Sequence, residues 1–64
     1  MKISTEKIEL AMANAVVGTK RLSELTGIAP AMITRIKNGS QQPRPVTVGK
    51  IAKALNVKVE DLVE

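Results

Sequence analysis

The sequence contains no cysteine, no histidine and no aromatic residue. Without cysteine the chain forms no disulfide, and without cysteine and histidine it has no ordinary zinc site. The commonest catalytic bases and nucleophiles are missing too, as is a phosphate-binding glycine loop, so we expect no enzyme, no metal and no cofactor. The missing aromatics argue against single-strand and RNA-binding modules, which stack bases on aromatic side chains.

A chain of 64 residues predicts one domain, residues 1–64, that buries only about 60% of its unfolded surface. The hydrophobic residues, 44% of the chain, are all aliphatic or methionine, so the core must be aliphatic. No apolar run approaches the roughly 20 residues that span a membrane. Charges at Glu6, Lys7 and Glu9 interrupt the segment that begins at Met1 and argue against a secretory signal. We therefore expect no membrane association and a cytoplasmic location.

The net charge is +4 and the isoelectric point is about 9.9. A small basic domain favours a polyanionic partner such as nucleic acid, although a basic surface also serves solubility. The six acidic residues are scattered, and we interpret them as charge balance.

The spacing of apolar residues predicts a helix that begins after Ser4, a favourable N-cap residue, and ends at Val16–Gly18. Its apolar positions are Ile8, Ala11, Met12 and Ala15. A later helix begins at Pro45 or Thr47, with apolar positions at Val48, Ile51, Ala52 and Leu55. A last short helix over residues 59–63 should turn Leu62 inward, and no strand is predicted.

Residues 19–39 predict two short helices joined by a glycine turn. The first begins near Gly18 or Thr19, carries Leu22 and Leu25 inward, and ends at Gly27 in the left-handed conformation. The second begins at Pro30, buries Ile33 and Ile36, and ends at Asn38–Gly39. Two helices in this order are typical of a helix-turn-helix, which places its second helix in the major groove of double-stranded DNA.

From about Ile8 to Leu62 the chain resembles the phage-repressor (Xre/Cro) family of helix-turn-helix proteins. The likeness rests on Leu-Ser-Glu-Leu-Thr-Gly-Ile at 22–28, Ile-Thr-Arg-Ile-Lys-Asn-Gly at 33–39, Pro43, and Ile-Ala-Lys-Ala-Leu-Asn-Val at 51–57. The resemblance implies an all-α, lambda-repressor-like domain of five short helices. It also implies a protein that binds operator DNA, usually as a dimer, and regulates transcription.

Several positions depart from the family pattern. Thr19 stands where the family often has a glutamine that bonds a phosphate, and Ala29 stands where a serine or threonine usually caps the second helix of the motif. Related proteins often pair an arginine with a glutamate at the positions that align with Met12 and Lys37, so that pair is missing here.

The candidate DNA contacts lie on the motif and the loop after it. They are Thr19, Lys20, Arg21, Ala29, Pro30, Ala31, Thr34, Arg35, Asn38, Ser40, Gln41 and Arg44. Lys20 and Arg21 are expected near a phosphate, and residues 38–44 along the sugar-phosphate backbone. Only Thr34 and Arg35 can hydrogen-bond base edges, while Ala31 and Ala29 can contact a thymine methyl.

Two functions fit this sequence. The first is a sequence-specific, double-stranded DNA-binding transcriptional regulator, such as a phage or mobile-element repressor or a Cro-like protein, acting as a homodimer. The alternative is a protein-interaction module on the same fold, such as an antirepressor. The apolar segment 29–32 favours the alternative, because it suits a hydrophobic protein partner as well as a base edge.

Overall fold

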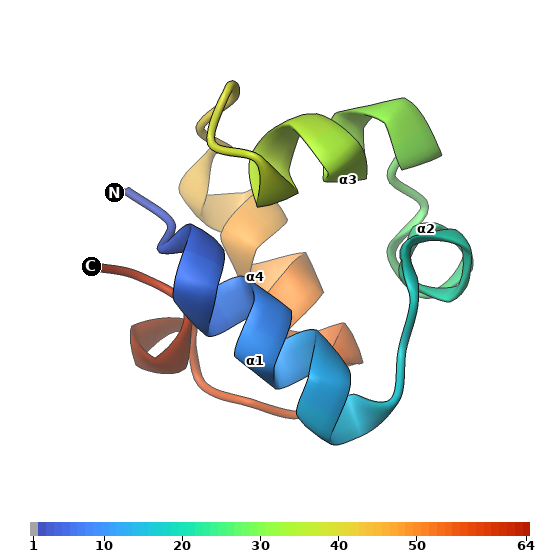
Figure 1. Cartoon of the computed structure of the whole chain (residues 1–64), viewed down its shortest axis with the longest axis horizontal. Coiled ribbons are helices and arrows are strands. Elements are labelled where there is room, and N and C mark those ends of the chain that lie inside the picture. The colour runs from blue at the N-terminus through green and yellow to red at the C-terminus, as the bar shows by residue number, and fades with distance from the viewer. Residues whose placement is uncertain (1) are drawn as a thin grey trace.

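The computed structural model describes residues 2–64 and contains four α-helices and one 3₁₀ turn (Figure 1). They are α1 (Thr5–Ala15), α2 (Thr19–Thr26), α3 (Pro30–Lys37), α4 (Pro45–Ala54) and η1 (Val59–Asp61). The predicted all-α class is confirmed, and the fifth helix is a single 3₁₀ turn. Met1, the first residue of the segment considered as a signal sequence, lies outside the described residues.

The helix ends follow the local sequence. The Ser4 hydroxyl accepts a hydrogen bond from the Lys7 N–H at 3.2 Å, which caps α1. Pro30 and Pro45 occupy the first positions of α3 and α4, where a missing N–H costs nothing. Gly27 ends α2 with a φ of 75°, a left-handed conformation that glycine adopts without strain.

All four helices contribute to one aliphatic core. Its fully buried large side chains are Ile3, Ile8, Leu22, Ile33, Ile36, Ile51, Leu62 and Val48. In Figure 1, α3 crosses one end of the domain, α2 stands beside it, and α1 lies in front of α4. This packing leaves the helix-turn-helix at the edge of the domain, with one side of α3 toward the core and the other toward solvent.

Two residues predicted to face inward are exposed. Ala15 is the last residue of α1, and the chain turns away directly after it. Leu25 is 45% exposed, although it lies one turn after the buried Leu22. Three residues advance a helix by about 300°, so Leu25 lies about 60° around α2 from Leu22. On this short helix, that rotation moves it off the core-facing side.

A contact between the two ends of the chain was not predicted. Ile3 and Val63 form an isolated antiparallel bridge, and the Ser4 N–H donates to the Leu62 carbonyl at 2.7 Å. The pairing buries Ile3 in the core with 1% of its surface exposed. Figure 1 shows the two ends on the same side of the domain. The extended residues at the N-terminus thus help to close the core.

Val16 occupies an unfavourable backbone conformation between α1 and α2. Its φ is 54° and its ψ 47°, in the left-handed region, which a β-branched residue rarely adopts. The other left-handed residues of the described chain are Gly27, Gly39 and Asn56, all of types that tolerate this region. Val16 is also 90% exposed, so little packing offsets the strain.

We expect Val16→Asn to stabilise the protein by about 0.5–1 kcal/mol. Asparagine relieves the left-handed strain, which costs about 1–2 kcal/mol for an ordinary residue, without the unfolded-state entropy that glycine would add. Thermal unfolding measures the difference. Val46→Asn is the matched control, because Val46 is also exposed but lies in a right-handed helix. Equal effects of the two substitutions would contradict a strained Val16.

Candidate nucleic-acid interface

The turn between α2 and α3 is fixed by side chains as well as by Gly27. The Gly27 N–H donates to the Ser23 carbonyl at 2.8 Å, and the Ser23 hydroxyl donates to the Ile28 carbonyl at 2.5 Å. The Thr26 hydroxyl donates to the Leu22 carbonyl and accepts from the Ile28 N–H. These bonds hold the angle between the two helices, so α3 is presented in one orientation.

One side of α3 is available to a partner. Ile33 and Ile36 point into the core, whereas Ala31, Thr34 and Arg35 are exposed. The Thr34 hydroxyl donates to the carbonyl of Pro30 at 3.1 Å, within its own helix. The hydroxyl oxygen can still accept a hydrogen bond from a partner, and the methyl group can make an apolar contact.

The start of α3 is apolar and exposed. Ala29 is the N-cap residue and makes no side-chain capping bond, and Pro30 has no N–H to offer. Ala31 adds a methyl group, and Met32 is half-buried beside the core. The only hydrogen-bonding side chains on the exposed side of α3 therefore come from its second half.

Lys37 joins the predicted site through Thr19. Its ammonium group donates to the Thr19 hydroxyl at 3.1 Å, and both residues are half-buried. The contact brings a positive charge from the end of α3 to the first turn of α2, beside Lys20. The contact between Lys37 and Thr19 was not predicted from sequence, because only the fold brings positions 19 and 37 together.

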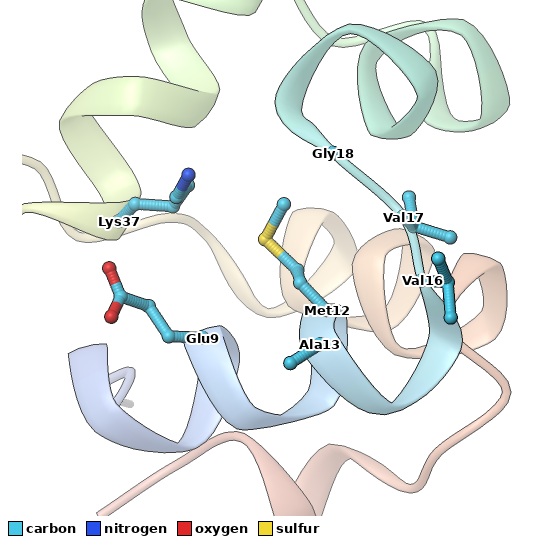
Figure 2. Close-up of a pocket in the computed structure, with 7 residues that line it drawn as sticks. All are labelled: Glu9, Met12, Ala13, Val16, Val17, Gly18 and Lys37. Atoms are coloured by element: carbon cyan, nitrogen blue, oxygen red, sulfur yellow. The ribbon is translucent and has the colours of Figure 1, made fainter.

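A small cavity opens between α1, the α1–α2 connection and Lys37 (Figure 2). In this view Glu9 of α1 and Lys37 of α3 face each other across it, and Met12 lies along its floor. Met12 and Lys37 hold the positions at which related proteins often pair an arginine with a glutamate. In this chain Lys37 bonds Thr19 instead.

The two basic residues in the first turn of α2 differ in their surroundings. Lys20 is exposed. The Arg21 guanidinium lies 3.3 Å from the Glu24 carboxylate, one turn further along the helix. Both side chains of this pair are more than half exposed, so the pairing contributes little and a phosphate can compete for the guanidinium.

The loop after α3 is held close to that helix. The Ser40 N–H donates to the Arg35 carbonyl at 3.0 Å and to the Asn38 side-chain oxygen at 2.9 Å. The Gln42 side-chain oxygen accepts from the Ile3 N–H at 3.0 Å, so this oxygen is used to fix the loop. The exposed residues of this segment include Asn38, Ser40, Gln41 and Arg44.

Charge is unevenly distributed along the chain. Residues 16–56 contain a single acid, Glu24, among seven basic residues: Lys20, Arg21, Arg35, Lys37, Arg44, Lys50 and Lys53. The other acids are Glu6, Glu9, Glu60, Asp61 and Glu64, in α1 and the C-terminal turn. The helix-turn-helix and the loop after it, residues 19–44, hold five of these basic residues and the one acid, so their net charge of +4 equals that of the whole chain.

Residues 2–64 were also considered as a membrane segment and as a metal site, and they have the features of neither. No helix in this range has both the length and the apolar character needed to cross a membrane. Nor do three or more acidic side chains gather there as a metal ion would require.

Comparison with known proteins supplies independent information. Residues 19–62 match the family model described as Helix-turn-helix. Over 51 residues the chain is 33% identical to the Uncharacterized HTH-type transcriptional regulator YvzC of Bacillus subtilis (strain 168). The alignment covers 80% of this chain and 66% of the relative, slightly under two thirds of its length. The matched region includes the whole of α2 and α3 and the loop after them, which build the interface described above.

Proposed function

Because this chain belongs to the Xre-like helix-turn-helix family, we propose that it is a sequence-specific regulator of transcription that binds double-stranded DNA. The observation that carries the proposal is the exposed side of α3. It presents Thr34 and Arg35 on a helix fixed by the turn at Gly27, with basic residues on both flanking segments. An α-helix with its side chains is about 10–12 Å in diameter, which fits a major groove about 12 Å wide.

Phosphate contacts would set the position of α3 in the groove. Lys20, Arg21 and the Lys37–Thr19 pair lie on one flank, at the start of α2, and Arg44 lies on the other, in the loop before α4. Contacts of this kind fix register but carry no base information. Base preference then falls to Thr34 and Arg35, with methyl contacts from Ala29 and Ala31.

Two copies would read two half-sites. The domain measures 24 × 21 × 19 Å, so two copies fit on one side of a duplex at half-sites about 34–36 Å apart. A dimer on such an operator blocks access to a promoter that overlaps it. We therefore propose a repressor of the phage, mobile-element or Cro-like type, with residues 1–64 as its single DNA-binding domain.

The apolar start of α3 supports a second candidate function. Ala29, Pro30 and Ala31 are exposed and offer no side-chain hydrogen bond, so they suit a protein partner as well as DNA. In that case the domain acts as an antirepressor or a similar module that binds another regulator.

A competition assay separates base reading from phosphate binding. A duplex selected from a random library is compared with its scrambled version. We expect Thr34→Ala and Arg35→Ala each to reduce the preference for the selected duplex by about 1–3 kcal/mol. Lys20→Ala should weaken binding to both duplexes equally, because it removes only a phosphate contact.

Thr34→Val refines the assay. The valine keeps the shape and the methyl group but loses the oxygen, so it should behave like Thr34→Ala if the oxygen accepts from a base amino group. If neither Thr34→Ala nor Arg35→Ala changes the preference, base reading by α3 is wrong. If, in addition, Ala31→Asp abolishes association with a protein partner, the interaction-module function is the correct one.

A further inference from the structure

A second surface feature lies apart from the proposed DNA interface. It is a shallow groove of about 320 Å³ between the last turn of α2 and the second half of α4. Its lining residues are Leu25, Thr26, Lys50, Lys53 and Ala54, which we call the α2–α4 groove. None of these residues is a candidate DNA contact, so occupation of the groove does not require α3.

The floor of the α2–α4 groove is apolar. Leu25 leaves 45% of its surface exposed here, on a helix whose other leucine is fully buried. Thr26 has used its hydroxyl, which donates to the Leu22 carbonyl at 2.7 Å and accepts from the Ile28 N–H at 3.2 Å. The methyl group is the part of Thr26 left to face a partner, next to the half-buried Ala54.

The rim of the α2–α4 groove is positively charged. Lys50 and Lys53 are exposed and lie one turn apart on α4, where like charges repel. Among the described residues, neither ammonium group lies within 4.0 Å of a carboxylate. The acid nearest to the groove in sequence, Glu24, faces Arg21 instead. The rim therefore carries two positive charges that a negatively charged partner would neutralise.

We propose that the α2–α4 groove binds an acidic amphipathic segment of another protein. One aliphatic side chain of that segment would rest on Leu25 and Ala54, and flanking aspartate or glutamate residues would face Lys50 and Lys53. The groove has room for one such side chain, and burial of an apolar anchor with charges at its rim is a common way of recognising a helical peptide.

A second copy of this chain has an exposed leucine beside an acid on α1, where Leu10 is 63% exposed next to Glu9, but it does not offer this pairing at its C-terminus. Its acidic C-terminal turn contains Glu60, Asp61 and Glu64, but the leucine of that turn, Leu62, is fully buried. The turn therefore has charge without a free leucine anchor. The groove lies outside the proposed DNA interface, so its binding of a peptide can be tested with no DNA present.

The test uses a random library of peptides of about twelve residues displayed on phage. The whole chain serves as the bait, and selected peptides are sequenced and measured by titration. We expect the selected peptides to carry a leucine or another large aliphatic residue flanked by acids. We also expect their amide chemical-shift changes to centre on the α2–α4 groove. Leu25→Asp and Lys50→Gln/Lys53→Gln should each weaken binding about tenfold or more.

Lys58→Gln is the matched control, because Lys58 is an exposed lysine outside the groove and its loss should leave peptide affinity unchanged. Thermal unfolding of each variant checks that the fold is retained. The proposal is overturned if selected peptides lack acids, if they bind the groove variants equally well, or if shift changes centre on α3. Concentration-dependent shifts at the groove without peptide would also overturn it, in favour of a second copy as the occupant.

Discussion

Raising the salt concentration from 50 to 200 mM should lower the affinity of each bound copy for duplex DNA by about 150- to 500-fold. The proposed interface carries five basic residues: Lys20, Arg21, Arg35, Lys37 and Arg44. Each neutralised phosphate contributes about −0.9 to the slope of log K against log salt. Five phosphate contacts give a slope of about −4.5, and four give about −3.6 if Arg35 contacts only a base edge. Fluorescence anisotropy with a labelled duplex over a salt series measures the slope.

Single substitutions assign this salt dependence to particular residues. Lys20→Gln should reduce the slope by about one, and so should Lys37→Gln. Lys53→Gln removes the same charge outside the interface and should leave the slope unchanged. A wild-type affinity that hardly varies with salt would refute a phosphate-dominated interface. Equal effects of Lys20→Gln and Lys53→Gln would show that net charge, rather than position, governs binding.

Leu22→Ala should destabilise the protein by about 2–5 kcal/mol. Leu22 is 0% exposed and lies in the middle of α2, so its truncation loses apolar burial and leaves a cavity beneath the helix-turn-helix. A domain of this size rarely has more than about 3–5 kcal/mol of stability from its core. We therefore expect the variant to be largely unfolded at 37 °C, as measured by circular dichroism and thermal unfolding.

Leu25→Ala provides a control of identical chemistry on the same helix. Leu25 is 45% exposed, so its truncation should cost less than about 1 kcal/mol. Equal losses of stability from the two substitutions would mean that Leu25 faces the core, as the sequence pattern first predicted. The comparison thus tests which side of α2 faces the core. Both the DNA interface and the α2–α4 groove depend on that orientation.

The helices themselves were determined by local sequence. Ser4, Pro30 and Pro45 set helix starts, and Gly27 adopts the left-handed conformation predicted for it. Caps and left-handed turns depend on neighbouring residues, so they can be predicted from the sequence without knowledge of the fold. The apolar spacing of α4 was also sufficient, because all four of its predicted core residues are buried.

Tertiary packing decided what local sequence could not. Ile3 is buried because it pairs with Val63, a residue sixty positions away along the chain, and no local pattern predicts that contact. Leu25 is exposed because a short helix turns only part of its apolar side toward the core. Lys37 reaches Thr19 because α3 packs against α2. The family resemblance identified the helix-turn-helix. The position of the Lys37 charge beside Thr19, however, results from packing between residues distant in sequence, which a sequence pattern does not contain.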